Sequence, residues 1–359
     1  MLKLVCAALV SLMFALEPSA ATAKEAKPHA VKKVKAKSQK AVAAKPARQR
    51  ARLVRRGSSG KRQLIYQNTR RAAPVFLAMT AGDRAGLNQT RDALDLGSSV
   101  AFVIDQANNQ VLFEKNAGVA LPIASITKMM TGLIVVESGL NLDEMLTITE
   151  ADVDRHKFTS SRLRVGATMS RRDLLHIALM SSENRAAAAL GRNYPGGIGA
   201  FVAAMNAKAQ ALGMTETRYV DSSGLSSQNV ASARDLARLA VVAYGEPLLR
   251  QFSTDPKYAV DDGRRTMQYG NTNYLVASPD WEIGLQKTGF INEAGKCLLM
   301  QAVISGRHVI MVFLDSKGRQ TRTADAGRVK RWLETSTTAA PPPAMYRPAS
   351  GAQGVTQGG

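Results

Sequence analysis

Strand-like apolar runs stand at both ends of the central part of this chain, and helical stretches lie between them. At the start, residues 100–105 and 111–113 are apolar runs on either side of an Ala-Asn-Asn-Gln turn. Towards the end, residues 297–304 and 308–314 flank a Ser-Gly-Arg turn. Each pair of runs predicts a β-hairpin. We therefore expect an α+β fold, in which an antiparallel β-sheet whose first and last strands meet packs against a helical cluster.

Helix signals occupy the stretch between the two hairpins. Residues 125–138 have a helical composition and are followed by a glycine, which is favoured just after a helix end. Ser170 and Ser232 each stand three residues before an Asp and open an apolar stretch, which is the spacing of a helix N-cap. A last helix is expected over residues 324–333. The folded domain should therefore span about residues 95–334.

The positive charge of the chain is concentrated in one segment. The sequence has 48 Lys and Arg against 28 Asp and Glu, a formal net charge of +20. Residues 24–71 alone hold 17 basic residues and a single acid, Glu25, so the folded domain is almost balanced and its charge does not indicate a specific nucleic-acid binder. A segment of this composition cannot bury enough apolar surface to fold. We expect residues 24–94 to form a basic, largely disordered arm, which is either a solvated tether or a binder of anionic wall polymer, a membrane surface or nucleic acid.

Both ends of the chain are predicted to lie outside the folded domain. Residues 1–23 have a basic start, a 13-residue apolar core and an Ala-Thr-Ala site, the pattern of a cleaved secretory signal peptide. The alternative is an N-terminal anchor, for which the run is short. Cleavage would remove Cys6 and leave Cys297 alone, which excludes an internal disulfide and indicates a buried structural thiol. Residues 335–359 contain three consecutive prolines and should form a disordered tail.

The first motif with chemical potential pairs Ser125 with Lys128. At a spacing of three residues on a helix, the hydroxyl and the amine lie on one face. A serine at a helix start also sits among free backbone N–H groups, which can hold the oxyanion when the serine attacks a carbonyl. Lys128 can act as a base only if burial or neighbouring cations lower its pKa. Alone, the S-x-x-K pattern is more often an N-cap followed by an exposed lysine.

Two further motifs follow at long intervals. The Ser-Glu-Asn motif at residues 182–184 begins 57 residues after Ser125 and alone indicates only a corner between helices. The Lys-Thr-Gly motif at residues 287–289 begins 105 residues later, in a short predicted strand bracketed by two glycines. A glycine there lets a ligand backbone approach closely, and Lys287 offers a fixed cation for a carboxylate. The intervals leave room for a helical cluster between the motifs.

The order S-x-x-K, S-x-N and K-[ST]-G is the signature set of penicillin-binding proteins and class A β-lactamases. From about residue 98 to residue 334, the sequence resembles the serine D,D-peptidases of the low-molecular-mass penicillin-binding proteins, and within them the D-alanyl-D-alanine endopeptidase branch. The resemblance implies an α+β fold of the β-lactamase/transpeptidase type. It is carried by four stretches, residues 121–128, 178–187, 224–229 and 285–297.

The resemblance also implies a role for each motif residue. Catalysis is expected from Ser125 as the nucleophile that forms an acyl-ester, Lys128 as its general base and Ser182 as the proton relay to the leaving amine. The backbone N–H groups of Ser125 and Phe290 would form the oxyanion hole. Glu183, in the middle of S-x-N, should point away from the site. Substrate binding is expected from the other motif positions and their neighbour: Asn184, Lys287, Thr288, Gly289 and Phe290.

The implied activity is hydrolysis of D-alanyl-diamino acid crosslinks in peptidoglycan by a penicillin-sensitive periplasmic enzyme. Its expected partners are the peptide crosslinks and β-lactam inhibitors, and the resemblance implies neither a cofactor nor a metal ion. The main alternative is a D-alanyl-D-alanine carboxypeptidase, which uses the same site to release terminal D-alanine. Such carboxypeptidases usually carry a second β-rich domain. Only 70 residues follow Gly289 here, and the last 25 look disordered, which favours the endopeptidase.

Other functions agree less well with the sequence. A class A β-lactamase needs a deacylating Glu in an E-x-x-L-N pattern after S-x-N, but the matching Glu137 stands before that motif, 12 residues after Ser125. No G-x-S-x-G pattern supports a Ser-His-Asp hydrolase, and His156, His176 and His308 have no motif context. No HExxH or paired cysteines indicate a metal enzyme. An inactive wall-binding module would not need three intact motifs.

Overall fold

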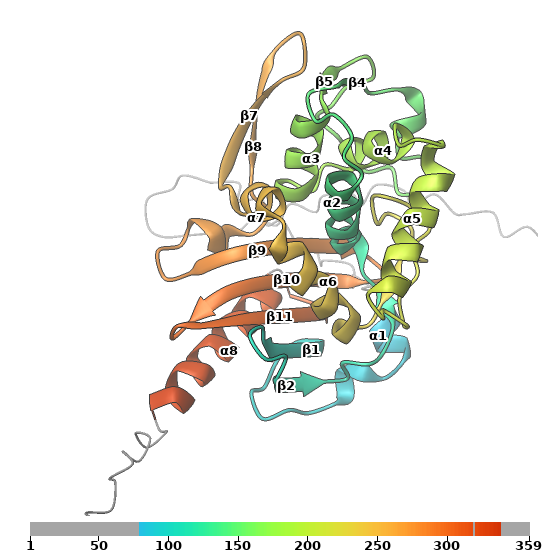
Figure 1. The fold of residues 1–359 in the computed structure, drawn as a ribbon. Helices are drawn as coiled ribbons and strands as arrows, with labels where there is room; N and C mark the ends of the chain where they lie inside the picture. Colours follow the sequence, from blue (N-terminus) through green and yellow to red (C-terminus); the bar gives the residue numbers. More distant parts are fainter. Residues whose placement is uncertain (1–78, 319, 339–359) are drawn as a thin grey trace, which may run out of the picture. The chain divides into compact units, whose positions relative to one another are not determined.

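A five-stranded antiparallel sheet organises the part of the chain that the structure describes (Figure 1). The structure is a computed structural model, and it describes residues 79–318 and 320–338. The sheet consists of β1 (Ser98–Asp105), β2 (Val111–Lys115), β9 (Glu282–Ile291), β10 (Gly295–Ile304) and β11 (Arg307–Ser316). The strand order is β2-β1-β11-β10-β9. The first and last strands therefore meet as predicted, with Val103 of β1 opposite Met311 of β11.

Both faces of the sheet are covered, so its inner strands are buried almost residue by residue. On β1, Val100 and Phe102 pack in the core shared with the helical cluster, whereas Ala101 and Val103 pack on the opposite face. That second face is closed by the last helix, α8 (Thr321–Thr338), which contacts β10 and β11. Successive side chains of a strand point to opposite faces. This double burial explains the continuous apolar runs of the sequence.

Six helices form the cluster on the sheet face that carries Val100 and Phe102 (Figure 1). They are α2 (Thr127–Glu137), α3 (Arg171–Met180), α4 (Asn184–Arg192), α5 (Gly197–Ala211), α6 (Ala233–Gly245) and α7 (Pro247–Thr254). Helix α6 contacts β1, β9, β10 and β11, and α2 packs against α3, α4, α5, α6 and α7. The predicted N-caps are present, because Ser170 and Ser232 accept hydrogen bonds from the N–H groups of Asp173 and Asp235. The expected α+β architecture is confirmed.

Small elements connect these layers. Three two-stranded pairs are β3 (Leu121–Pro122) with β6 (Val230–Ala231), β4 (Met145–Thr147) with β5 (Thr168–Ser170), and β7 (Lys257–Asp261) with β8 (Thr266–Gly270). The short helical turns are α1 (Ala81–Arg84), η1 (Leu87–Gln89), η2 (Ala124–Ile126), η3 (Glu150–Asp152) and η4 (Tyr274–Ala277). Of these, the β3–β6 pair and η2 matter most for function, because they lead directly into α2.

Three element boundaries differ from the expected ones. Ordered elements begin before residue 95, because Thr80 caps α1 through the N–H of Asp83 and the N–H of Ala81 donates to the carbonyl of Glu293 (2.8 Å). Helix α8 extends beyond the expected 324–333 at both ends. The two glycines of the Lys-Thr-Gly region lie inside β9, a strand of 10 residues, and do not bracket a shorter one.

The predicted signal peptide and most of the predicted arm and tail fall on residues 1–78 and 339–359, outside the described residues. Within residues 79–318 and 320–338, no helix combines the length and the apolar character that crossing a membrane requires.

Candidate active site

Ser125 lies in the 3-10 turn η2, directly before α2, so it stands at the start of the helix as the sequence predicted. The preceding residue, Ala124, has a φ of 48°, a left-handed conformation that is rare for residues with a side chain. Its carbonyl accepts a hydrogen bond from Thr127 Oγ1 over 2.8 Å. Gly224 packs so tightly here that a Cβ atom would lie 1.9 Å from the Ala124 carbonyl oxygen. The backbone at the serine is therefore held from both sides in a strained turn.

Lys128 is fully buried beside Ser125. Its Nζ donates hydrogen bonds to three oxygen atoms: Ser125 Oγ (2.9 Å), Asn184 Oδ1 (2.7 Å) and the carbonyl oxygen of Ser223 (2.5 Å). Burial lowers the pKa of Lys128 to about 7, although nearby carboxylates act in the opposite sense. An amine with this pKa is partly neutral near pH 7, so it can accept a proton from the serine hydroxyl that it touches.

Lys287 of β9 is the second fully buried lysine of the site. Its Nζ donates to Ser182 Oγ over 3.0 Å and to the Thr288 carbonyl over 2.9 Å. Burial lowers the pKa of Lys287 well below its ordinary value, and the charges of Lys128 and Arg322 lower it further. The three motifs are thus brought together: Ser182, which has a φ of 62°, links the corner between α3 and α4 to the edge strand.

The edge strand β9 passes close to the backbone of Ser125. Arg322 of α8 donates to the carbonyls of Gly289 (2.9 Å) and Cys297 (3.2 Å), which stand opposite each other on β9 and β10. The Gly289 carbonyl therefore points towards β10. In a trans peptide the next N–H points the opposite way, so the Phe290 N–H faces out from the sheet edge. A Cβ on Gly289 would lie 3.2 Å from the Ser125 nitrogen, so the strand edge at Gly289 lies directly against the backbone of Ser125.

The side chains around this centre are held by further hydrogen bonds. Asn184 Nδ2 donates to Thr159 Oγ1 over 3.2 Å. Glu183 Oε1 accepts from Ser161 Oγ over 2.7 Å, so its carboxylate is bound to Ser161 and not to Ser125. Thr288 and Thr272 share a hydrogen bond of 2.6 Å between their hydroxyls. The amide and hydroxyl groups of the motifs are thus fixed in place before any substrate binds.

Phe290 is the exposed member of the predicted set. Its side chain is 55% exposed, with Lys296 Nζ 4.2 Å from the ring centre. The ring of Phe290 therefore lies at the surface of the protein.

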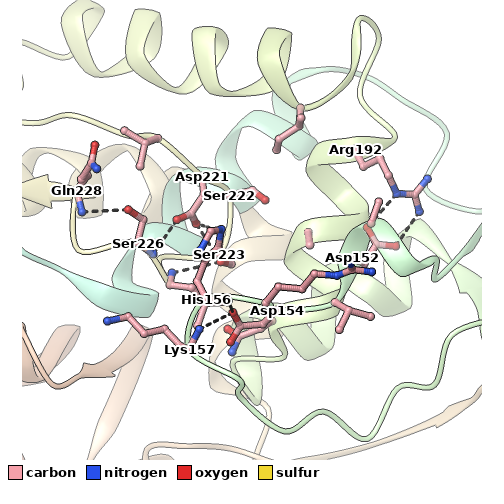
Figure 2. Close-up of a pocket in the computed structure, with 18 of the residues that line it drawn as sticks. Asp152, Asp154, His156, Lys157, Arg192, Asp221, Ser222, Ser223, Ser226 and Gln228 are labelled. Atoms are coloured by element: carbon pink, nitrogen blue, oxygen red, sulfur yellow. Dashed lines mark hydrogen bonds and ion pairs between the residues drawn. The ribbon is translucent and has the colours of Figure 1, made fainter. Parts of the chain in front are cut away.

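A cavity of about 1010 Å³ adjoins the site (Figure 2). Asn184 and Ser223 line it, and both are hydrogen-bond acceptors of Lys128. Figure 2 shows the ion pair of Arg192 with Asp152 on one side of the cavity and the segment from Asp221 to Gln228 on the other. The space is large enough for a peptide chain that leads away from the serine.

Sequence reasoning missed three contributors to the site. Arg322 reaches Gly289 across 33 positions, and Thr159 reaches Asn184 across 25, so neither belongs to a local motif. Asp221 folds the segment that carries Ser223, because its Oδ1 accepts from the N–H groups of Ser223 (2.7 Å) and Gly224 (2.6 Å). An Asp followed at the third place by Gly is a turn signal that could have indicated this loop.

The residues of the rival functions lie elsewhere. Glu137 is the last residue of α2, about three helical turns from Ser125, and it pairs with Lys208 over 2.6 Å. His176 is buried between the rings of Phe252 and Tyr258, while His156 and His308 are exposed. Within the described residues, no three His, Cys, Asp or Glu side chains gather as metal ligands would.

Cys297 is buried and free, and burial raises the pKa of its thiol to about 11. The predicted structural thiol is therefore confirmed.

Comparison with known proteins gives a consistent result. The family model described as D-alanyl-D-alanine carboxypeptidase matches residues 87–318. The chain is 51% identical over 252 residues to a D-alanyl-D-alanine endopeptidase of Pseudomonas aeruginosa, covering 70% of this chain and 81% of that protein. It is 42% identical over 265 residues to the D-alanyl-D-alanine endopeptidase of Escherichia coli, covering 73% and 84%.

The fold is similar to that of penicillin-binding protein D2 from Listeria monocytogenes in its cefotaxime-bound form. The TM-score is 0.60 at 30% sequence identity, over 67% of this chain and 98% of that one.

Proposed function

The chain belongs to the D-alanyl-D-alanine carboxypeptidase family of serine peptidases, and from that premise we propose that it is a penicillin-sensitive D,D-endopeptidase of peptidoglycan crosslinks. Two relatives with high identity over most of their length bear the name D-alanyl-D-alanine endopeptidase. The observation that carries the chemistry is the buried amine of Lys128, which lies 2.9 Å from Ser125 Oγ and has a pKa of about 7. The substrate is the amide between a D-alanyl carbonyl and the side-chain amine of a diamino acid.

In the acylation step, Ser125 Oγ attacks the D-alanyl carbonyl carbon while its proton passes to Lys128 Nζ. The N–H groups of Ser125 and Phe290 stabilise the oxyanion as it forms. The C–N bond then breaks, and the electron pair leaves with the amine nitrogen. That nitrogen takes up the hydroxyl proton of Ser182, which in turn receives the proton held by Lys128 Nζ, so Lys128 is neutral again before the second step. Lys287 can fix this hydroxyl because its Nζ already donates to Ser182 Oγ over 3.0 Å.

Asn184, Thr288 and Lys287 hold the substrate during this step. The amide of Asn184 binds the substrate amide, and Lys287 with Thr288 binds the carboxylate on the leaving side. In the second step, Lys128 takes a proton from a water molecule that attacks the ester carbonyl. The bond to Ser125 Oγ breaks while Lys128 returns the proton to this oxygen, and the shortened peptide leaves with a free carboxylate.

The proposed function is tested by digesting purified crosslinked peptidoglycan and separating the products by chromatography. An endopeptidase converts dimeric muropeptides into monomers without releasing D-alanine. A carboxypeptidase, the second candidate because the family model bears that description, releases D-alanine and leaves the dimers intact. The Ser125→Ala variant is the control and should produce neither. Dimers that persist with wild-type enzyme would reject the endopeptidase.

Export and the role of the basic segment complete the proposal. Residues 1–23 would direct the chain to the periplasm and be removed, which mass spectrometry of the mature N-terminus can verify. The 17 basic residues of the segment 24–71 would bind anionic wall polymer in a strongly salt-dependent way. A chain shortened to begin near residue 75 should keep its turnover of a soluble crosslinked peptide and lose retention on cell-wall material at low salt. Loss of that turnover would contradict a pure tether.

A further inference from the structure

Phe158 combines two features that folded proteins usually avoid. Its side chain is 83% exposed, and its backbone has a φ of 52°. Among the described residues, it is the only aromatic one with a left-handed backbone. A bulky side chain in this region is strained, and such strain persists mainly where it serves a function.

The residues on either side of Phe158 in the chain contact the surroundings of the site. Lys157 forms an ion pair with Glu293, which belongs to the turn between β9 and β10. Thr159 accepts the hydrogen bond of Asn184. Lys157 thus contacts the turn that follows Phe290 in the chain. Thr159 contacts Asn184, which accepts a hydrogen bond from Lys128. Phe158 lies between Lys157 and Thr159 in the chain, so the segment that carries it borders the site.

The loop that carries Phe158 is held by Asp154. Its carboxylate accepts hydrogen bonds from the N–H groups of His156 (2.8 Å), Lys157 (2.9 Å) and Thr159 (2.8 Å) and from the Thr159 hydroxyl (2.8 Å). Figure 2 shows Asp154 and Lys157 joined in this way at the edge of the cavity. The left-handed turn is therefore imposed by a network of bonds around it.

We propose that Phe158 is a substrate-contact residue, whose ring packs against the aliphatic part of the peptide crosslink. The inference rests on the proposed function and adds a specificity determinant to it. The crosslink carries the methyl group of D-alanine and the methylene chain of the diamino acid, which are the apolar groups that the ring would cover. An exposed ring gains from covering such groups, because both apolar surfaces leave water. A β-lactam is more compact and extends less far from Ser125.

The test compares Phe158→Gly and Phe158→Tyr on a soluble crosslinked peptide that carries no sugar. Glycine relieves the left-handed backbone, so the melting temperature should equal or exceed that of the wild type. KM should nevertheless rise about five- to tenfold, with a much smaller change in kcat, because one apolar contact is lost. Tyrosine keeps the ring and should keep KM within about twofold of the wild type.

Two matched controls separate this effect from general changes. Ser305→Gly relieves a φ of 50° in the turn between β10 and β11 and should leave KM unchanged. Val111→Ala removes an exposed apolar side chain from β2, at the opposite edge of the sheet from β9, and should also leave KM unchanged.

Acylation by a small β-lactam tests the proposed function separately from the role of Phe158. Phe158→Gly should lower the reactivity of the enzyme with the crosslinked peptide more than its reactivity with the β-lactam. If the wild type is not acylated at all, the proposed function fails and this inference fails with it. If the wild type is acylated but KM for the peptide is the same in Phe158→Gly, Phe158 is not a substrate contact. If KM rises only with disaccharide-bearing substrates, the ring binds sugar and the proposal is overturned.

Discussion

Lys287 Nζ donates a hydrogen bond to Ser182 Oγ over 3.0 Å, although 105 residues separate the two. The bond joins the edge strand β9 to the corner between α3 and α4. Because Ser182 has a left-handed backbone, its hydroxyl is presented to the strand and not to its own helix. The site thus depends on the way in which the sheet and the helical cluster dock. Its residues can be tested one at a time.

Replacing Lys128 by Arg should abolish acylation. The guanidinium keeps the positive charge but cannot deprotonate in proteins, so it cannot accept the proton of Ser125. The rate of labelling by a fluorescent penicillin should fall by at least about 100-fold. The Lys287→Arg variant keeps the positive charge that would bind the carboxylate, so its labelling rate should fall less than that of Lys128→Arg. Because Arg is larger than the buried Lys, Lys128→Met serves as a second variant. Labelling of both Lys128 variants at the wild-type rate would rule out the general base.

The acylation rate should rise with pH and level off above neutrality. The proposed base is the neutral form of Lys128, whose pKa is lowered to about 7, so the active fraction increases as pH rises through that value. Stopped-flow labelling between pH 5 and pH 9 measures this profile. A midpoint near the ordinary lysine pKa of about 10.4 would show that burial does not tune this amine.

Gly289→Ala should slow acylation sharply while the protein stays folded. A Cβ at this place would lie 2.8 Å from the Ile123 carbonyl and 3.2 Å from the Ser125 nitrogen, so the strand edge must move away from the serine. Removal of one oxyanion donor costs about 100- to 1000-fold in rate, and displacing the edge should approach that loss. Gly270→Ala on β8, where a Cβ meets nothing within 4 Å, is the control and should label normally.

Penicillin should remain attached to Ser125 for a long time once it has reacted. The amine released when the β-lactam ring opens stays tethered to the acyl group and obstructs the water that Lys128 would activate. The only Glu in an E-x-x-L-N pattern, Glu137, lies at the far end of α2 and cannot activate a water from another side of the ester. Mass spectrometry of the intact protein should show a persistent adduct, and Ser125→Ala should show none. Rapid return of the unmodified mass in the wild type would indicate a β-lactamase.

The parts of the site that are local in sequence were predictable, and those that arise from docking were not. Ser125 and Lys128 are three residues apart, so one turn of backbone brings them together. The antiparallel sheet was predictable because the apolar runs and turns of its two hairpins are visible in the sequence. Arg322 acts through a helix that covers the opposite face of the sheet, and no pattern near Gly289 indicates it. Turns of three or four residues, such as α1, are too short for any periodicity to show.

The two buried lysines have a thermodynamic consequence. Burial and mutual repulsion disfavour the cation at Lys287, whereas a bound carboxylate favours it. Binding of a carboxylate ligand should therefore be accompanied by proton uptake from the solvent wherever the free amine is deprotonated. Calorimetry of a non-reactive carboxylate ligand in two buffers with different ionisation enthalpies would then give different apparent heats. As pH rises, Lys287 loses its charge and the enzyme would bind the substrate carboxylate more weakly, while a larger fraction of Lys128 becomes neutral and able to accept the proton of Ser125. The pH of highest activity is therefore a compromise between substrate binding and acylation.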